Sequence, residues 1–549
     1  MMYVQGLANF LDDLMGGLEL LSLSILVGSL FWGALVLRVW SPDGAAPASA
    51  WRGSTRVLRA GALALAVTQA LKILTKAAVL ASALGELPLT VYAGTVQFQA
   101  GAIRVGLAAA LLWVTRGWHE RPTSRPRWVA AVGLTAMLLV AGAWLVHGVG
   151  RLENRGTLMA LTVVHQLAAA VWVGGVVQLL WLWHISRDDD RAREFWPLGV
   201  TRFSALGVGS VAALLATGIV LAWQYVGSLD GLVGTGYGSL VAAKVFLLGV
   251  TLGFAYLNFR AGRDWLRDRS ARAVVTGVPC HVEAETFLLV GILFLAATVS
   301  SQPPAIDIPG LTASVSELLE MFTPRLPRLT SPTHDALLAG QAASVALVGR
   351  IPSAAGSQWS DYNHNVSGIF LIGMSVLALL SYRRGFGWAR YWPLGFVALS
   401  VFLFFRSDAE AWPLGPVGFW QSTFGDGEVL QHRIATLLAF ALGALETRAR
   451  AGKQASERLQ AVFPVLCAFG GVLLVTHAHT AFEIKSQYLI QSTHLAMGLL
   501  AIIMATGRWL ELRLTKTGNA IEARFSGLVA VGAMVMIGAI LAIYREPLG

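Results

Sequence analysis

The stretch FSALGVGSVAALLATGIVLAWQYV runs from residue 203 to residue 226 without one charged side chain. A helix rises about 1.5 Å per residue, so about 20 apolar residues are enough to cross the ~30 Å hydrocarbon core of a bilayer. The stretch therefore predicts a membrane-spanning helix. Composition extends this interpretation to the whole chain, because 55% of its 549 residues are hydrophobic and only 13% are charged. A soluble globular core does not fit these values.

Apolar runs of similar length recur from one end of the chain to the other. They predict an all-α, polytopic integral membrane helical bundle of about 14 transmembrane helices. The tenth run is short and holds Pro393 near its start, and its loss would reverse the orientation of every later span. The expected spans are residues 18–40, 58–83, 97–115, 128–148, 158–183, 203–226, 238–259, 282–301, 364–381, 391–405, 429–447, 461–478, 488–510 and 525–544.

Arginine marks every second loop of this pattern. Because Lys and Arg accumulate in short cytoplasmic loops, these loops are predicted to face the cytoplasm and both termini the outside, N-out and C-out. The net charge of +10 then follows from topology, and we expect no nucleic-acid partner. The arginine-bearing loops are residues 52–56, 116–127, 187–202, 260–272, 383–390, 448–458 and 513–524.

One long polar segment interrupts the helical rhythm. Residues 302–362 hold seven prolines and are predicted to lie outside. They divide the chain into an eight-helix membrane domain (1–301), a periplasmic loop (302–362) and a six-helix membrane domain rich in outer-side histidines (363–549). Within the loop, residues 311–322 and 333–349 have a mixed pattern that predicts short helices lying on the membrane surface.

Histidines are distributed unevenly across this predicted membrane. Imidazole is costly in lipid unless it is paired or binds a ligand, so each histidine on a span needs a partner. A metal ion or a haem is one such partner, and an interhelical hydrogen bond or an interfacial position is the alternative. Eight of the eleven lie in the outer half or beyond it, namely His147, His165, His334, His364, His432, His477, His479 and His494.

Several of these histidines share a helix face with other candidate residues. On the fifth span, His165 lies in one stripe with positions 168, 172 and 175, which hold small residues and a tryptophan. On the eleventh span, His432 follows Glu428 by one turn. On the thirteenth, Met497 lies one turn deeper than His494. The last two stripes are at similar predicted depth, which favours a shared site.

The candidate metal ligands are nitrogens and one thioether. His477 and His479 end the twelfth span, and two helical residues differ by about 200° in direction, so both reach one site only if the helix unwinds. Imidazole with thioether and almost no thiolate suits copper, and zinc is disfavoured by the scarcity of carboxylates and thiolates. Two facing histidines also suit a b-type haem, which stays open as the alternative cofactor. The predicted ligands are His165, His364, His432, His477, His479, His494 and Met497.

A second set of buried charges is cationic. Buried positive charges require partners, so these residues predict a polar chamber that accepts haem propionates, a quinone or an anion. Ordinary salt bridges are the alternative, with Glu19 and Glu285 as the counter-charges on spans. With Glu19 and Glu285 as the only counter-charges on spans, the positive charge of the chamber exceeds its negative charge, and this excess would repel Cu⁺. The four cations are Lys72, Lys76, Arg104 and Lys244.

Beyond these patterns, part of the chain resembles a known family. The run His165-Gln-Leu-Ala-Ala-Ala-Val-Trp-Val-Gly-Gly175, then Arg202-Phe-Ser204, Thr217-Gly218, Gly236-Tyr237-Gly238 and Lys244, is similar to the copper resistance protein D (CopD) family. The resemblance covers roughly residues 150–305, and the first four spans more loosely. It implies a multi-pass protein of the bacterial inner membrane that acts in copper uptake or tolerance, often with a periplasmic copper-binding protein of the CopC type.

The second half resembles the C-terminal extension of longer CopD members. It carries Leu430-Gln-His-Arg433 and Leu474-Val-Thr-His-Ala-His479. The three residues Gln431, His432 and Arg433 are also similar to haem A synthase, whose histidines bind haem at helix ends. No segment resembling CopC is fused here.

Three hypotheses follow from the sequence. The first is a copper-handling inner-membrane protein that binds the ion at periplasmic-side histidines. The second is a b-type haem redox protein with bis-histidine ligation, linked to a quinone near Lys72, Lys76 and Arg104. The third is a scaffold whose histidines only pack and hydrogen bond. We expect transport or metal binding in preference to enzymatic activity. An enzyme here would be a haem or copper oxidoreductase.

Overall fold

The computed structural model describes residues 2–38, 46–118, 124–269, 272–345, 353–452, 457–476 and 484–547. Within these ranges the chain is helical, and its one β-contact is an isolated bridge between Ala411 and Val417. Fourteen of the described helical segments are long and apolar enough to cross a membrane, so the predicted all-α membrane bundle is confirmed. The tenth span, which the sequence supports least, is present as Gly387–Arg406.

The helices separate into two compact units. The N-terminal unit comprises Leu11–Gly227 and Lys244–Ile306, and the C-terminal unit comprises Met1–Phe10, Ser228–Ala243 and Asp307–Gly549. Most of the predicted periplasmic loop therefore groups with the chain that follows it.

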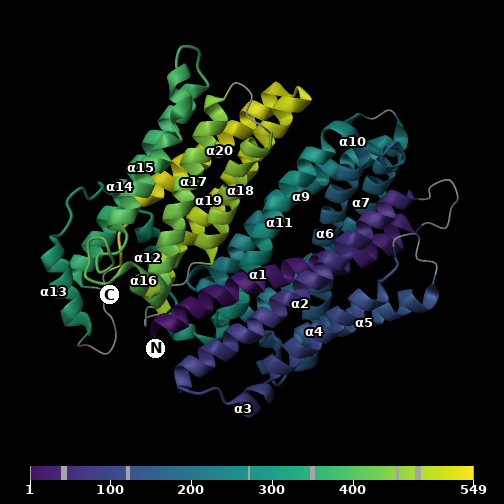
Figure 1. Ribbon diagram of the computed structural model, residues 1–549, viewed down its shortest axis with the longest axis horizontal. Helices are drawn as coiled ribbons and strands as arrows, with labels where there is room; N and C mark the ends of the chain where they lie inside the picture. The colour runs from purple at the N-terminus through teal and green to yellow at the C-terminus, as the bar shows by residue number, and fades with distance from the viewer. Residues whose placement is uncertain are drawn as a thin grey trace. The chain divides into compact units, whose positions relative to one another are not determined.

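The N-terminal unit is built from eight long helices and four short ones. The pairs α6 with α7, α2 with α4 and α4 with α5 lie side by side, and α6 also contacts α11 (Figure 1). The long helices are α1 (Met2–Trp32), α2 (Ala48–Leu84), α4 (Val96–Val114), α5 (Arg125–Ala143), α6 (Arg155–Ser186), α7 (Asp190–Val226), α9 (Gly236–Arg267) and α11 (Val278–Ser301). The short ones are η1 (Gly33–Leu37), α3 (Leu89–Ala93), η3 (His147–Gly150) and α10 (Ala273–Thr276).

In the C-terminal unit, four pairs of helices pack side by side (Figure 1). They are α19–α20, α14–α20, α18–α19 and α15–α17. Its short helices α12 and α13 lie within residues 311–322 and 333–349, where short helices are predicted. Their location on a membrane surface stays a prediction. The elements are α8 (Leu229–Val233), η5 (Pro309–Leu311), α12 (Val315–Met321), α13 (His334–Val345), α14 (Ala354–Ser381), η6 (Gly387–Tyr391), α15 (Leu394–Arg406), α16 (Phe419–Gly425), α17 (Gly427–Ala451), α18 (Glu457–Val475), α19 (Ile484–Thr517) and α20 (Ala520–Ile543). The short helix η4 (Ala305–Asp307) includes the last residues of the N-terminal unit and the first of the segment that follows.

Glycine sets the closest helix contacts in each unit. Gly28 of α1 faces Gly174 of α6, and a methyl group on either would overlap the backbone of the other helix. Gly368 of α14 meets Gly538 of α20 in the same way. Small residues let membrane helices approach until their backbones are in van der Waals contact, which replaces the hydrophobic driving force that is missing in lipid.

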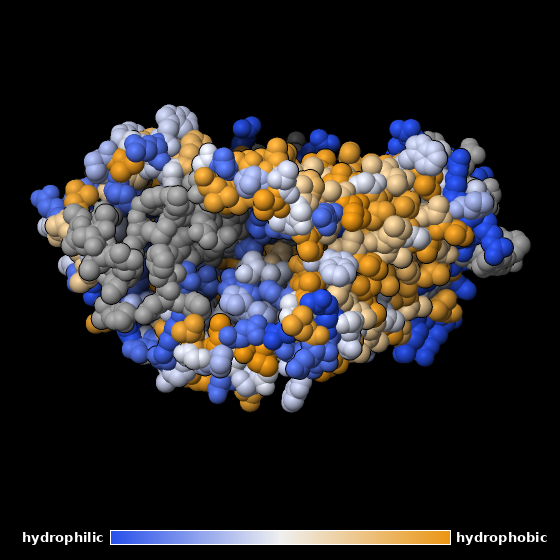
Figure 2. All heavy atoms as spheres, turned by 90° about the horizontal axis from the view of Figure 1, so that it is seen from below, coloured by the Kyte–Doolittle hydropathy of each residue, from blue (hydrophilic) through white to orange (hydrophobic). Residues whose placement is uncertain are grey.

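The exterior of the N-terminal unit matches a lipid environment. Figure 2 shows a broad hydrophobic face over its helices, with hydrophilic residues gathered at the end of that face. Exposed apolar side chains on α2 and α5 contribute to this surface, among them Leu63, Val67, Leu74, Val129 and Val132. An exposed apolar face of this extent is stable in lipid and not in water.

Candidate functional site

Two predicted ligands from distant parts of the sequence meet in the C-terminal unit. His364 lies on α14 and His494 on α19, and their ring centroids are 5.9 Å apart with the rings nearly perpendicular. Ser353 caps the start of α14, because its side chain accepts a hydrogen bond from the amide of Gly356. The cap fixes the start of α14 and therefore the position of His364 on it.

The hydrogen bonds of both rings determine where their hydrogens lie. Nδ1 of His364 is 2.8 Å from the carbonyl oxygen of Ser360, and Nδ1 of His494 is 3.1 Å from that of Ile490. A carbonyl oxygen only accepts, so each Nδ1 carries the hydrogen and donates it. In the neutral ring the lone pair then lies on Nε2, the nitrogen that can bind a metal ion.

Tyr544 packs against this pair from just beyond the end of α20. Its ring centroid lies 4.1 Å from that of His364, tilted by 30°, and 6.5 Å from that of His494. The side chain is almost completely buried, and burial raises the pKa of the Tyr544 phenol well above its usual value. Tyr544 is therefore a neutral wall of the site and supplies no anionic oxygen.

The C-terminal segment that carries Tyr544 is fastened to α14. The amide of Asn365 donates to the carbonyl oxygens of Leu541 and Tyr544, at 3.0 and 3.1 Å. Arg545 donates to the side-chain oxygen of Asn365 at 2.6 Å and to the carbonyl oxygen of Leu326 at 2.6 Å. These contacts hold Tyr544 in place beside His364.

A third histidine, on α17, is paired with a carboxylate. Nδ1 of His432 is 2.7 Å from Oδ1 of Asp408, whose other oxygen accepts from Ser407 at 2.6 Å. Burial acts to raise the pKa of Asp408, but the charge and hydrogen bond of His432 outweigh burial and hold it below its usual value. Asp426 caps α17 by accepting from the amide of Glu428 at 2.9 Å.

His364, His432 and His494 form what we call the histidine cluster. His364 is close enough to both others for their charges to act on it. Within the described ranges, no group of three or more His, Cys, Asp and Glu side chains is arranged to hold a metal ion. The cluster therefore offers one close histidine pair, with His432 as its neighbour.

The other predicted ligands have different outcomes. Met497 is buried one turn further along α19 and stays a predicted ligand. His477 and His479 lie outside the described residues. His165 belongs to the N-terminal unit, where Nδ1 is 2.9 Å from the hydroxyl oxygen of Thr217. That hydroxyl donates its own hydrogen to the carbonyl oxygen of Ala213 at 2.7 Å, so it accepts from His165.

The predicted polar chamber contains ion pairs. Nζ of Lys72 lies 2.9 Å from Oε2 of Glu19, and Arg104 binds the other oxygen of the same carboxylate. Lys76 lies 3.1 Å from Asp12. Three of the four predicted cations therefore meet in one network. A role for that network in binding a cofactor stays a prediction.

The remaining cation and the second predicted counter-charge lie apart from that network's ion pairs. Lys244 on α9 acts electrostatically on His165. Glu285 on α11 accepts from the amide of Asn258 at 2.9 Å, and His281 contacts the amide oxygen of Asn258 at 3.2 Å. Among the described residues, Glu285 is thus a hydrogen-bond partner of α9 and forms no salt bridge with a cation.

Two residues of the site are not among those predicted from the sequence. Asp408 follows α15 in a connecting segment, and Tyr544 follows the last span. Their predicted outer location, together with an acidic or aromatic side chain, was the available clue. Neither stands in a periodic pattern with a histidine.

Comparison with known proteins bears on the N-terminal unit most directly. Residues 199–299 match the family described as Copper resistance protein D (CopD). The copper transport protein CutJ of Bacillus subtilis (strain 168) is 26% identical over 214 residues, which cover 38% of this chain and 37% of CutJ. The chain thus matches little more than a third of the length of that relative.

The matched segment contains Thr217, Lys244 and Glu285, and the histidine cluster lies outside it. No solved structure matches the chain. Residues 199–299 of this chain, which has 14 helices in its described part that are long and apolar enough to cross a membrane, are therefore similar to the copper-related CopD family.

Proposed function

We propose that this protein transports or sequesters copper and that the ion binds between His364 and His494. The supporting observation is the meeting of these two rings, from α14 and α19, with both Nδ1 atoms donating to backbone carbonyls. Backbone hydrogen bonds of this kind fix the tautomer and orientation of a metal-binding imidazole.

The separation of the rings suits a single shared ion. Imidazole nitrogens bind first-row metal ions at about 2.0–2.1 Å, so two imidazoles on opposite sides of one ion have centroids about 6 Å apart. The observed separation is 5.9 Å. Two neutral imidazole nitrogens favour copper over the harder cations, which prefer several oxygen ligands, and the thioether of Met497, three residues after His494, would favour it further.

His432 completes the proposed site as a neighbour of the pair. Its hydrogen bond to Asp408 is the carboxylate–histidine arrangement that raises the basicity of a ligating imidazole. The carboxylate also offsets the positive charge that His432 carries when it is protonated. In this proposal, Asp408 acts through His432 and does not bind copper itself.

The cellular setting is part of the proposal. From the arginine pattern we expect the cluster in the outer half of the membrane. The resemblance to CopD proteins implies a bacterial inner membrane, where a CopC-like protein would deliver the ion from the periplasm. Because CutJ is a copper transport protein, transport is the activity the comparison favours. The comparisons name copper and give no support to the haem alternative.

Elemental analysis of the purified full-length protein tests the proposal. We expect one copper per chain in the wild type, strong depletion in His494→Gln, and wild-type content in His184→Gln. His184 is exposed on α6 and belongs to no cluster, so it is the matched control. An absorption spectrum of the same sample reports on haem through its Soret band. Equal copper in all three proteins, or none in the wild type, would reject the site.

A further inference from the structure

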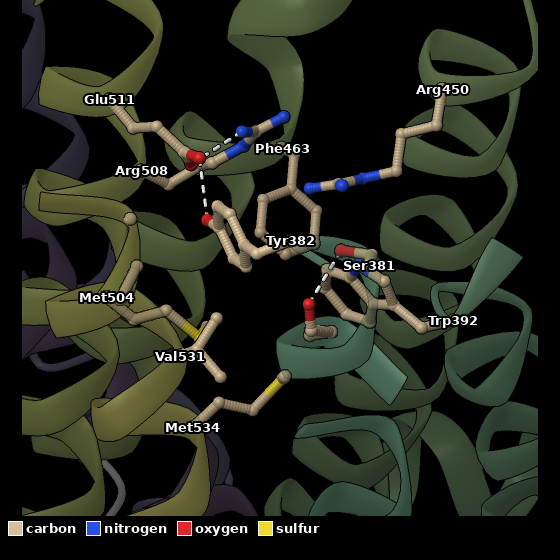
Figure 3. Close-up of a pocket in the computed structure, with 13 residues that line it drawn as sticks. Ser381, Tyr382, Trp392, Arg450, Phe463, Met504, Arg508, Glu511, Val531 and Met534 are labelled. Carbon is tan, nitrogen blue, oxygen red and sulfur yellow. Dashed lines mark hydrogen bonds and ion pairs between the residues drawn. The ribbon is translucent and has the colours of Figure 1, made fainter. Parts of the chain in front are cut away.

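A pocket lies in the C-terminal unit, on helices that also carry the histidine cluster but lined by other residues. The free space between its side chains is about 340 Å³, which includes its opening to the surroundings. Helices α14, α17, α18, α19 and α20 line it, and Figure 3 shows charged side chains at one side and apolar ones at the other.

The charged side of the pocket is held in place by a hydrogen-bonded network. Arg508 donates to Glu511 at 2.7 Å and to Glu446 at 3.0 Å. Tyr382 donates to the other oxygen of Glu511 at 2.6 Å, as the dashed line in Figure 3 shows. Arg508 and Tyr382 thus donate to the carboxylates of Glu511 and Glu446 and hold them in place.

Arg450 has N–H groups that this network does not use. Its Nε donates to Glu446 at 2.7 Å, and its guanidinium lies over the ring of Trp392, 5.1 Å from the centroid. In Figure 3 the terminal nitrogens extend toward Tyr382 and Phe463 across the pocket. Within the described ranges, these two nitrogens meet no protein acceptor at hydrogen-bond distance.

Other buried polar atoms of the pocket are also unsatisfied. The indole nitrogen of Trp392 is buried and has no partner in the described part of the chain, and neither has Nε of Arg508. Buried polar groups nearly always have a partner, so such a set indicates a bound group or ordered water.

The opposite side of the pocket suits a hydrocarbon chain. Met504 from α19 and Val531 and Met534 from α20 form this wall, with Phe463 from α18. Figure 3 shows the two methionine side chains lying below the charged network. A ligand that fills both sides must have a polar group with acceptor oxygens joined to an apolar chain.

Exposed cations lie next to the pocket in sequence. Arg383 and Arg384 follow Tyr382 directly, and Arg390 lies two residues before Trp392. The connection that carries them, residues 382–393, contains no acidic residue. Basic pockets between membrane helices on the cytoplasmic side bind anionic lipid head groups, and this connection is predicted to face the cytoplasm.

We propose that this pocket binds the phosphate of an anionic phospholipid, with Arg450 on the phosphate oxygens and one acyl chain against Met504, Val531 and Met534. The bidentate fork of an arginine matches phosphate geometry. The site is separate from the proposed copper site and does not depend on it.

Native mass spectrometry of the full-length protein tests this. The protein is delipidated in detergent and titrated with phosphatidylglycerol, with phosphatidylcholine and with inorganic phosphate alone. We expect phosphatidylglycerol to bind at least about tenfold more tightly than phosphatidylcholine. Arg450→Gln should lose at least about tenfold of that affinity, because a hydrogen bond to a charged group is removed.

Two further variants separate the pocket from general surface charge. Val531→Phe keeps every charge but fills the apolar side, and we expect it to lose phosphatidylglycerol as well. Arg448→Gln removes an exposed arginine from the same helix and should bind as the wild type does. Equal loss in Arg448→Gln and Arg450→Gln, or no preference between the two lipids, would overturn the proposal. Binding of inorganic phosphate without retention of lipid would also overturn it.

Discussion

Replacing His364 and His494 by glutamine, singly and together, tests whether the two rings share one ion. Glutamine keeps a polar side chain of similar length but lacks the imidazole nitrogen. If both rings bind the same copper ion, either substitution alone should remove nearly all of the binding energy. The double variant should then lose little more, because residues that act as one unit give non-additive effects.

The structure allows the magnitude to be estimated. Removing a partner of a ligating histidine typically costs about 10–100-fold in metal affinity, so removing the ligand itself should cost more than ~100-fold. Folding stability should change less. For His364, the lost contact with Tyr544 and the lost bond to Ser360 are each worth about 0.5–1.5 kcal/mol. His494 loses the bond to Ile490 and should cost about 0.5–1.5 kcal/mol.

The assay is competition for Cu(I) with a chromophoric chelator, under reducing conditions, on the full-length protein in detergent. Thermal unfolding without copper separates loss of the site from loss of the fold. His184→Gln serves as the control. Single-variant losses that multiply in the double variant would mean that the two rings act independently. That result, or near wild-type affinity in either single variant, would refute the shared-ion geometry.

Three further outcomes follow from the same contacts. Asp408→Asn should weaken copper binding about 10–100-fold through His432, and unchanged affinity would place His432 outside the site. Glu19→Gln leaves buried Arg104 without its carboxylate and should destabilise the protein by about 3–5 kcal/mol in chemical unfolding, so a loss under 1 kcal/mol would contradict the pairing. Burial raises the pKa of Glu546 from 4.5 to about 7, so the folded chain retains a proton that the unfolded chain has released between these values. Docking of the C-terminal segment should therefore weaken as pH rises from about 4.5 to 7. Hydrogen exchange at the backbone amides of residues 544–546, corrected for intrinsic rates, should show this in the wild type and not in Glu546→Gln.

The membrane fold is predictable because each span depends on a local property. A run of apolar residues long enough to cross lipid must be helical wherever its neighbours lie, since no other structure satisfies its backbone. For this reason the spans are found even where a single feature opposes them, as with the short tenth span near Pro393. Their ends differ from the prediction by several residues, because helices extend past the lipid into caps such as Ser353.

The histidine cluster is predictable only in part. The arginine pattern places His364, His432 and His494 at similar depth, but depth does not say which helices touch. The contact depends on α14 and α19 both packing on α20, and α14 does so through Gly368. A glycine inside an apolar run is too common in membrane helices to identify that contact in advance.

The sequence identifies the buried cations of the N-terminal unit but not the carboxylates that pair with them. Lys72, Lys76 and Arg104 on their own indicate an excess of positive charge that would repel Cu⁺. In the structure, they face three carboxylates on α1. Glu19 binds two of them, Asp12 binds the third, and Asp13 lies within electrostatic range of both lysines. The paired carboxylates of Glu19 and Asp12 therefore offset most of the positive charge of the three cations, and the repulsion expected of the predicted chamber is reduced accordingly. Whether these charges pair depends on how α1 is rotated toward α2 and α4. The spacing of residues along one helix does not determine that rotation.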